Sequence, residues 1–304
     1  MANIVTITLN PALDKSISVP ELVPEKKLRA LSAKVEPGGG GINISRALKK
    51  LGVASEAIIL SGGYTGKTLE ALLAKEQVEF TAIQTAGDTR ENFVVFDEDK
   101  KLQYRFGMPG ELISDQELAL LMQAIGNCAH ADYIVVSGSL PPGTSTAVFH
   151  EIAIIAEQLK AKLIIDTSGD GLKAAVKEGL YLIKPNLREL ASLVGKDWID
   201  ISEVIGTARQ IITAGSCKAM AVSMGADGAM LITATEHFQT VAPKAPVLST
   251  VGAGDSMVAG MLAALTKGWG WEHVLPYGVA AGSAATGLKG PARWAVAETE
   301  RRVA

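Results

Sequence analysis

Cysteine, histidine and aromatic residues are scarce in this chain of 304 residues. The two cysteines, Cys128 and Cys217, lie among apolar or small residues, with no second cysteine or histidine at metal-ligand spacing. We therefore expect two buried free thiols rather than a metal site. The four histidines are scattered along the chain and predict no catalytic constellation.

Positive charge and long apolar runs are also missing. The net charge is −3, so the chain as a whole is not drawn to nucleic acid or to an anionic membrane. No apolar run reaches the length of about 20 residues that spans a bilayer, and residues 1–5 lack the basic start of a signal peptide. We expect a soluble cytoplasmic protein with no nucleic-acid or membrane partner, which meets anionic substrates through local cations.

Two common nucleotide-binding motifs are absent as well. The chain contains no GxxxxGK[ST] sequence, and its glycine runs do not lie in the GxGxxG context of dinucleotide-binding units. These absences argue against a P-loop enzyme and against an NAD-dependent enzyme.

The residues that are abundant are aliphatic, with a hydrophobic share of 48%. Val-, Ile- and Ala-rich runs alternate with helical patterns, most regularly after Gly110 and ending in helices near 254–267 and 271–287. This alternation predicts one α/β domain with a mostly parallel sheet and helices on both faces. The expected strands are 4–9, 57–60, 133–136, 162–165, 180–183, 219–223 and 229–232.

Two stretches depart from this alternation. Residues 93–96 and 102–106 flank a charged turn, which is typical of a β-hairpin. Together with strands expected at 15–19 and 28–35, they predict a small sheet made by two insertions, at about 13–36 and 88–108. No expected helix covers its apolar face, and such a face usually meets a partner or closes over a ligand.

Glycine and polar residues gather where the expected strands end. In a parallel α/β sheet the ligand site lies beyond the carboxyl ends of the strands. The segments that follow the strands are Asn10-Pro11, Gly62-Gly63, Ser137-Gly138-Ser139, Asp166-Thr167-Ser168-Gly169, Lys184-Pro185-Asn186 and Ser223-Met224-Gly225. We expect the active site at this edge.

Residues 249–255, Ser-Thr-Val-Gly-Ala-Gly-Asp, lead into an apolar helical pattern. Amides at a helix start lack internal acceptors, and glycines at 252 and 254 let a phosphate approach them closely. Asp255 beside such an anion site suits a base that takes a proton from an attacking hydroxyl. The alternative is that Asp255 caps an ordinary helix after a glycine turn.

Lys184, Asn186 and Glu189 mark another strand-to-helix junction. Lys184 suits contact with a triphosphate, while Asn186 and Glu189 suit Mg²⁺ held through water, because magnesium prefers oxygen ligands and keeps part of its hydration shell. The alternative is a capping box formed by Asn186 and Glu189, and the two roles are compatible.

The glycine run at 38–41 opens a helix that carries Asn43, whose amide can bind sugar hydroxyls. A flexible hinge is the alternative for this run. Asp14 can accept hydrogen bonds from sugar hydroxyls or simply form a turn.

Four cations fall in the expected small sheet or at its edges: Lys27, Arg29, Arg90 and Arg105. The guanidinium fork of Arg suits a substrate phosphate. The alternative is that these charges are solvated and discourage edge-to-edge aggregation.

These motifs together resemble the PfkB, or ribokinase-like, family of carbohydrate kinases over essentially the whole chain. Both family signatures are visible, at residues 37–46 and 249–256. Within the family, NPALD, PGGGGIN, YRFGMP, SGSLPPG and KPN look most like the members that act on fructose 6-phosphate. The resemblance implies a three-layer α/β/α sandwich with a small β lid, and MgATP-dependent phosphorylation of that sugar at its C1 hydroxyl.

The resemblance also implies roles for individual residues. Asp255 matches the catalytic base, and Gly252, Ala253 and Gly254 match the anion hole. The sugar-phosphate positions are Asp14, Arg29, Gly39, Asn43, Arg90, Arg105 and Ser139, with Arg29 reaching in from a neighbouring subunit. The nucleotide positions are Lys184, Asn186, Ser223, Gly225, Gly228, Ala253, Val279 and Ser283. Glu189 matches the magnesium-linked position and Lys27 a second, inhibitory ATP site.

Further implications concern cations and assembly. Ser249, Val251, Ala285 and Gly290 match a potassium site, although the loop at 286–291 departs from the family's usual polar sequence. The lid implies a homodimer, with a tetramer as a further possibility. A kinase for fructose 1-phosphate or tagatose 6-phosphate, and a catalytically silent sugar-phosphate-binding regulator, are the alternative functions.

Overall fold

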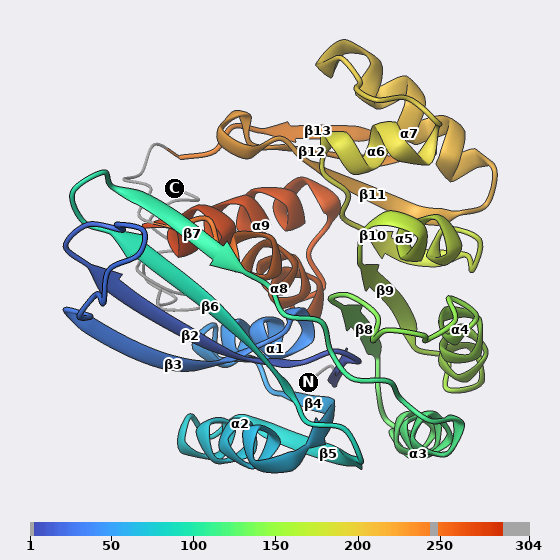
Figure 1. The fold of residues 1–304 in the computed structure, drawn as a ribbon. Coiled ribbons are helices and arrows are strands. Elements are labelled where there is room, and N and C mark those ends of the chain that lie inside the picture. Colours follow the sequence, from blue (N-terminus) through green and yellow to red (C-terminus); the bar gives the residue numbers. More distant parts are fainter. Residues whose placement is uncertain (1–2, 244–248, 288–304) are drawn as a thin grey trace.

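A nine-stranded sheet forms the centre of the part of the protein that the structure describes, residues 3–243 and 249–287 (Figure 1). The structure is a computed structural model. In order across the sheet the strands are β13 (His237–Thr240), β12 (Ala229–Thr233), β11 (Cys217–Ser223), β10 (Leu180–Ile183), β9 (Lys162–Asp166), β8 (Tyr133–Ser137), β1 (Ile4–Thr8), β4 (Ser55–Gly62) and β5 (Glu79–Thr85). Strands β11 to β5 are parallel, and β12 and β13 add an antiparallel edge.

The central strands are apolar because helices cover both faces of the sheet. All five residues of β1 and of β8 are buried, and successive side chains point to opposite faces. In β1, Val5 and Ile7 belong to the core on one face, whereas Ile4 belongs to the core on the other. Continuous aliphatic runs therefore identify these strands from the sequence.

Two groups of helices complete the three layers. One face is covered by α1 (Gly40–Lys50), α2 (Gly63–Lys75), α8 (Ala253–Thr266) and α9 (Trp271–Thr286). The other face is covered by α3 (Asp115–Gly126), α4 (Val148–Gln158), α5 (Gly169–Ala175), α6 (Leu187–Leu193) and α7 (Val204–Thr213). The predicted α/β/α sandwich is confirmed.

Helices α8 and α9 pack at unusually close range. A methyl group at Gly260 would lie 2.6 Å from the Cβ of Ala281, and one at Gly278 would lie 2.5 Å from the Cγ of Met261. Glycine at these two positions lets the helix backbones approach. This packing fixes the axis of α8, whose first turn faces the candidate site.

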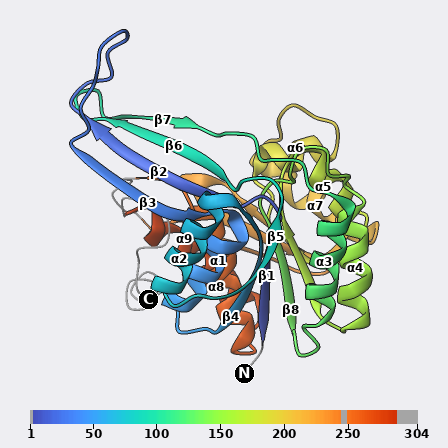
Figure 2. The same ribbon diagram turned by 60° about the horizontal axis from the view of Figure 1, so that its bottom comes forward.

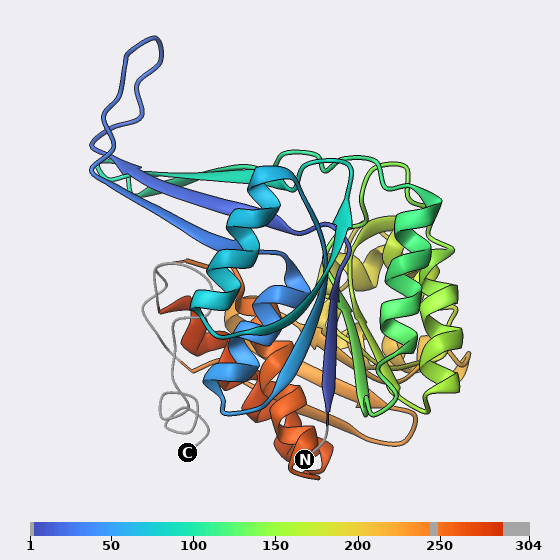
Figure 3. The same cartoon turned by 90° about the horizontal axis from the view of Figure 1, so that it is seen from below.

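The second sheet, here called the small sheet, has the order β3-β2-β6-β7. Its strands are β2 (Ala12–Val19), β3 (Ser32–Gly38), β6 (Arg90–Asp97) and β7 (Leu102–Phe106). The hairpin expected around residues 97–101 is present as β6 and β7. Figures 2 and 3 show the small sheet extending beyond the main sheet, with the loop 20–31 projecting from its far end.

The two faces of the small sheet differ sharply in chemistry. Strand register places Val35, Lys15, Phe93 and Phe106 in one row on one face, with the Lys15 ammonium over the Phe93 ring. The three apolar side chains of this row are 42%, 36% and 50% exposed. The other face carries Asp14 and Arg105, and Arg105 donates a hydrogen bond to Thr250 of the main domain. The polar face therefore points toward the main domain, and the apolar face points away from it.

Two strands were not expected, β5 and β13. Both lie at edges of the main sheet and keep exposed or half-exposed side chains, including Glu79 and His237. An edge strand needs no continuous apolar run, so the signal that identifies the central strands is weak there. The small-sheet strands begin or end a few residues from the expected positions.

The scarcity of cysteine also has an outcome. Cys128 and Cys217 are buried free thiols, as predicted. In the described ranges, no cluster of three or more His, Cys, Asp or Glu side chains has the arrangement of a metal site. Nor does any helix there have both the length and the apolar character needed to cross a membrane.

Candidate active site

The start of α8 is open to a ligand. The helix begins at Ala253 after Gly252, which adopts a left-handed conformation with φ 75° and provides no side-chain cap. A methyl group at Gly254 would lie 3.2 Å from the Nζ of Lys184, so this turn packs closely against a cation. Glycines at both positions keep the first amides of a 14-residue helix accessible at its electropositive end.

Asp255 lies in the first turn of α8 but does not cap it. Its carboxylate accepts a hydrogen bond of 2.9 Å from the Nδ2 of Asn43, a residue of α1 that is 212 positions away in the chain. Gly252 is the N-cap, so the alternative of an Asp255 cap is excluded by the geometry. The carboxylate is instead turned toward α1.

The surroundings of Asp255 favour its protonated form. Burial, followed by the negative charge of Asp166, raises the pKa of Asp255 to about 6, against the opposing effects of Asn43 and Lys184. A carboxylate with this pKa is ionised at neutral pH and is a better proton acceptor than an exposed aspartate. Asp255 is thus suited to general-base chemistry.

Asn43 is buried, and the accessible fraction of the residue is 7%. Its Nδ2 is used by Asp255, whereas no donor from the described residues reaches its buried Oδ1. A buried amide oxygen without a partner is costly and calls for a donor from elsewhere. A hydroxyl group of a ligand beside Asp255 would supply one.

A cleft of 590 Å³ lies on one side of the α8 start, and its lining is mostly apolar. Its volume falls in the range of small-molecule sites, about 300–1,000 Å³. The sequence-predicted nucleotide positions that line it are Ser223, Gly225, Gly228, Ala253, Val279 and Ser283. These residues come from β11, from the turn before β12 and from helices α8 and α9.

A polar hollow of 360 Å³ lies on the other side of the α8 start. Asp255, Ser139, Lys184, Asn186 and Glu189 all line it. The structure therefore places Asp255 in the polar hollow and its neighbours Ala253 and Gly254 in the apolar cleft, so the two spaces meet at this turn.

Lys184 is the buried cation of this hollow, with 8% of the residue exposed. Its Nζ lies 3.3 Å from a carboxylate oxygen of Asp166. Burial lowers the pKa of Lys184, yet Asp166, Asp255 and Glu189 outweigh burial and raise the pKa above its usual value. Lys184 is therefore a fixed positive charge next to the α8 start.

Asn186 and Glu189 form the capping box that opens α6. The Asn186 side chain accepts from the Glu189 amide, and Glu189 Oε2 accepts from the Asn186 amide, each at 2.9 Å. The box uses one carboxylate oxygen of Glu189 and leaves the residue lining the polar hollow. The capping role and a place at the site coexist.

On the small-sheet side, Asp14 is held by its neighbours. Asn92 donates to Asp14 at 2.9 Å, and Arg90 lies close to both. Burial is the largest influence on Asp14 and raises its pKa, against the hydrogen bond from Asn92 and the charge of Arg90. A methyl group at Gly38 would lie 2.4 Å from the Asp14 carboxylate, so the glycine run makes room for this acid.

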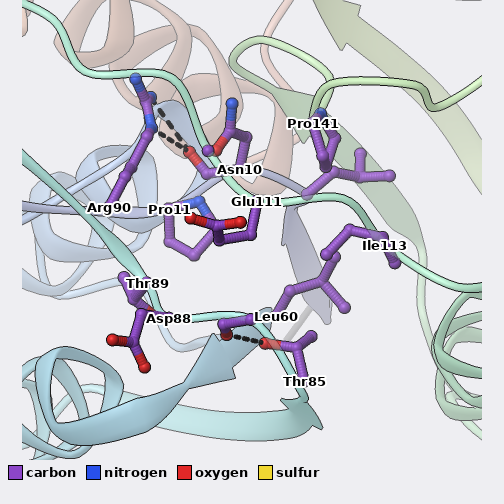
Figure 4. A pocket seen from close by; sticks show the side chains of 13 residues that line it. Asn10, Pro11, Leu60, Thr85, Asp88, Thr89, Arg90, Glu111, Ile113 and Pro141 are labelled. Atoms are coloured by element: carbon purple, nitrogen blue, oxygen red, sulfur yellow. Dashed lines mark hydrogen bonds between the residues drawn. The ribbon is translucent and has the colours of Figure 1, made fainter.

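Arg90 and Ser139 are linked through Asn10, as Figure 4 shows for Arg90 and Asn10. Arg90 donates to the carbonyl oxygen of Asn10 at 3.1 and 3.3 Å, and Asn10 donates to the Ser139 hydroxyl at 3.2 Å. The pocket of Figure 4, next to this contact, has a volume of only 20 Å³, enough for a single water molecule. It is too small for a sugar or a nucleotide.

The glycine run enters α1 through a conformation that needs glycine. Gly39 has φ 117°, and a methyl group there would lie 2.6 Å from the Thr8 side chain. Gly39 is the N-cap of α1, four residues before Asn43. The run thus serves both to turn the chain and to place Asn43.

Other predicted residues are not gathered around Asp255. Arg29 and Lys27 are exposed on the projecting loop 20–31, at the far end of the small sheet (Figure 3). Of the predicted potassium ligands, Ser249 lies against the end of α9, because its amide donates to the Thr286 carbonyl at 3.2 Å. Val251 follows in the same loop and Ala285 precedes Thr286, whereas Gly290 lies outside the described residues.

Sequence reasoning gave no individual role to Asn92 or Thr250, and it named Asn10 only as part of the strand-end edge. Asn92 is a polar residue opposite Asp14 in the register of β2 and β6, a pairing that only the fold reveals. Thr250 lies in the predicted motif, but its contact with Arg105 requires the small sheet to be placed. Asn10 did have a signal, since it directly follows β1.

The model of the pfkB family carbohydrate kinases matches residues 4–296. The chain belongs to this family.

Named relatives of this pfkB-family chain include the ATP-dependent 6-phosphofructokinase isozyme 2 of Escherichia coli (strain K12). The two are 39% identical, over 94% of this chain and 93% of the relative. The 1-phosphofructokinase of Bacillus subtilis (strain 168) is 32% identical, over 92% of this chain and 91% of the relative.

Solved structures agree with the fold. The crystal structure of phosphofructokinase-2 from E. coli in complex with fructose-6-phosphate gives a TM-score of 0.93 at 37% identity, covering 100% of this chain and 98% of that one. A ribokinase from Arabidopsis thaliana gives 0.78 at 20% identity, covering 100% and 99%, which supports the fold alone. The pfkB-family chain thus has the ribokinase-like fold predicted from its motifs.

Proposed function

We propose that this pfkB-family kinase transfers the γ-phosphoryl group of ATP to the C1 hydroxyl of fructose 6-phosphate, giving fructose 1,6-bisphosphate. The observation that carries the proposal is the position of Asp255. A carboxylate with a raised pKa lies where an apolar cleft of nucleotide size meets a polar hollow. The names of the E. coli relatives supply the sugar.

In the proposed reaction the adenine and ribose occupy the apolar cleft, and the phosphates reach the α8 start. The Asp255 carboxylate accepts the proton of the C1 hydroxyl as its oxygen attacks the γ-phosphorus in line. Amides of Gly252, Ala253 and Gly254 and the Lys184 ammonium offset the negative charge on the phosphoryl oxygens. Asn43 holds Asp255 in place through its 2.9 Å hydrogen bond.

The sugar phosphate would lie between the polar face of the small sheet and α1. Asp14 and Asn43 suit the sugar hydroxyls, with Gly39 and Ser139 beside them. Arg90 and Arg105 suit the 6-phosphate, because guanidinium groups bind phosphate oxygens through two donors. Arg105 donates to the side chains of Gln103 and Thr250, exposed contacts that a phosphate can replace.

Magnesium fits the polar hollow, where Asn186, Glu189 and Asp166 offer oxygen donors beside Lys184. Glu189 would hold the ion through water. When bound, Mg²⁺ neutralises phosphate charge and orients the transferred group. For K⁺ we propose carbonyl donors near the loop of Ser249 and Val251 and the end of α9 at Ala285; Gly290, the fourth predicted ligand, lies outside the described residues.

We further propose a homodimer formed by the apolar faces of two small sheets. The exposed apolar side chains of Val35, Phe93 and Phe106 support it, since such side chains gathered on one face of a monomer are unfavourable in water. The loop that carries Arg29 and Lys27 projects from the same sheet, so Arg29 would enter the neighbouring site and Lys27 would serve a second ATP. One relative's structure is described as the tetrameric inhibited form of phosphofructokinase-2 from E. coli.

A second candidate is supported by other relatives. Two proteins named 1-phosphofructokinase are 32% and 35% identical to this chain, and one named D-tagatose-1-phosphate kinase is 30% identical. Such kinases would use the same base and anion site with a different sugar phosphate. The geometry around Asp255 speaks against a catalytically silent regulator.

The experiment is a coupled assay of ADP release with MgATP and each of three sugars: fructose 6-phosphate, fructose 1-phosphate and tagatose 6-phosphate. We expect kcat/KM for fructose 6-phosphate to exceed the other two at least tenfold, which is about 1.4 kcal/mol of discrimination. A higher value with fructose 1-phosphate would favour the second candidate. No turnover with any of the three would contradict the proposal and support a binding function.

A further inference from the structure

A buried arginine outside the proposed catalytic set connects three elements. Arg46 lies in α1, one helical turn after Asn43, and only 4% of its surface is exposed. Its Nε and Nη2 donate to the two carboxylate oxygens of Glu76 at 2.6 and 2.7 Å, and its Nη1 donates to the Pro37 carbonyl at 3.1 Å. A second acid, Glu36, accepts from Nη2 at 3.5 Å. One guanidinium thus joins α1, the C-cap of α2 and strand β3 of the small sheet.

The position of this contact matters because β3 enters α1 through glycine. Residues 38–41 have no side chains that could fix the angle between the small sheet and the main domain. Pro37 precedes this run, and Arg46 holds its carbonyl from within α1. Gly38 in turn packs against the carboxylate of Asp14. The contacts of Arg46 therefore fix the part of β3 that lies against Asp14.

Charge gives Arg46 a second task. Asp14 and Glu36 are direct partners in the antiparallel register of β2 and β3. Like charges directly opposite each other in a sheet repel. Arg46 and Lys34 both pair with Glu36 and compensate its charge. After the effects of burial, Asn92 and Arg90, Glu36 raises the pKa of Asp14 and Arg46 lowers it.

Stability alone is a weak reason for such a cluster. Desolvation of buried ion pairs offsets much of their attraction, and well-packed apolar residues often replace them without loss of stability. An apolar side chain at position 46 could neither donate a hydrogen bond to the Pro37 carbonyl nor compensate the negative charge of Glu36.

We propose that Arg46 is a positioning residue that fixes the small sheet, and with it Asp14, relative to the Asn43–Asp255 pair. This proposal rests on the proposed function, because Asp14 belongs to the sugar-phosphate side of that site. The nucleotide cleft is built from β11, the turn before β12, α8 and α9, whereas the hydrogen-bond partners of Arg46 among the described residues are Glu76, Pro37 and Glu36. Loss of Arg46 should therefore affect the sugar phosphate and spare ATP.

The kinetic test compares Arg46→Lys and Arg46→Met with the wild type, using fructose 6-phosphate and MgATP. Lysine keeps the charge but cannot form the two-pronged contact. We expect KM for the sugar phosphate to rise at least about tenfold in both variants, and KM for ATP to stay within about twofold. Adding Glu36→Gln to Arg46→Met should recover part of the sugar-phosphate KM, because it removes the uncompensated acid opposite Asp14.

Ile212→Ala is the matched control for general destabilisation. Ile212 is a buried residue of α7, on the opposite face of the main sheet. Its truncation should lower stability by a cavity effect and leave both KM values unchanged. If Arg46→Met does not fold, Arg46→Lys and Glu76→Gln carry the comparison.

Amide hydrogen exchange separates this proposal from the proposed function. Without ligand, Arg46 variants should exchange faster than the wild type in residues 32–38 but not in β11 or α9. That result stands even if the wild type phosphorylates none of the tested sugars. Equal changes in both KM values, or unchanged exchange at 32–38, would show that Arg46 is only a core residue and overturn the proposal.

Discussion

At the scale of a single residue, opposing electrostatic effects act on the charge of Asp255. It lies in the first turn of α8, where an anion is stabilised, yet burial and Asp166 disfavour its charge. Asn43 and Lys184 counteract this penalty only in part. A base that is costly to ionise is a better proton acceptor, so the local structure exchanges stability for reactivity.

This exchange predicts the effect of Asp255→Asn on stability. The pKa of Asp255 is about 6 in the folded protein and 3.8 as a reference. An acid with a raised pKa binds extra protons in the folded state, so its contribution to stability falls as pH rises from about 4 to about 6. Above that range the ionised carboxylate costs at most about 3 kcal/mol, less where solvent screens it. Asp255→Asn should therefore melt higher than the wild type at pH 8, with a smaller difference at pH 5.

Asp97→Asn is the control of opposite sign. Backbone amides of Lys100 and Leu22 donate to Asp97 and lower its pKa, so its carboxylate stabilises the folded state above the unfolded pKa. Asp97→Asn should melt lower than the wild type at pH 8. Thermal melts at both pH values check the pair. An Asp255→Asn variant that is no more stable than the wild type at pH 8 would argue against a strained base.

At the scale of an element, the two faces of the small sheet have different chemistry and different proposed roles. Its polar face bears Asp14 and Arg105 toward the main domain, while its apolar face is exposed. A specific dimer usually buries about 800 Å² on each partner. Because successive side chains of a strand point to opposite faces, the same four strands supply both the polar residues toward the main domain and the proposed dimer interface.

Phe93→Glu should dissociate the proposed dimer, because it removes the exposed ring between Lys15 and Phe106 and puts a carboxylate in its place. Sedimentation at micromolar concentration should give a dimeric mass for the wild type and a monomeric mass for the variant. Ile154→Glu is the matched control, since Ile154 of α4 is 43% exposed on a helix away from the small sheet. A monomeric wild type, or a dimeric Phe93→Glu variant, would contradict the proposed interface.

Elements were predictable from the sequence where their signal is local. Gly252 and Gly254 predict the start of α8, and the charged turn between two apolar runs predicts the hairpin of β6 and β7. Buried central strands follow from their aliphatic runs. Strands β5 and β13 lacked such a signal because edge strands are only half-buried.

At the scale of the whole molecule, the contacts that matter join distant segments. The hydrogen bond between Asn43 and Asp255 spans 212 residues, and that between Arg105 and Thr250 spans 145. A strand-end rule predicts the edge at which such residues meet, but not the pairs they form. The family resemblance supplied residue roles that spacing alone does not give. Arg46 is an example of what the sequence does not show. It is a charged residue on the buried face of α1, and its partners are known only from the fold.

The connection of the two sheets also belongs to this scale. The chain passes from main sheet to small sheet after β1 and after β5, and returns at Gly39 and after β7. The apolar cleft and the polar hollow both open at the edge of the main sheet where these crossings occur, and Asp255 lies where they meet. The proposed function requires a nucleotide and a sugar phosphate to meet at this one carboxylate, and that is its central claim.

Phosphorus NMR of the product, with wild type and Asp255→Asn, tests that claim most directly. With MgATP and fructose 6-phosphate, the wild type should convert the sugar phosphate to fructose 1,6-bisphosphate, with a new phosphate signal at C1. Asp255→Asn should lower kcat by about 10³-fold or more, while both KM values stay within a few-fold, because only the proton acceptor is lost. A phosphate at another position, or wild-type turnover in Asp255→Asn, would contradict the account.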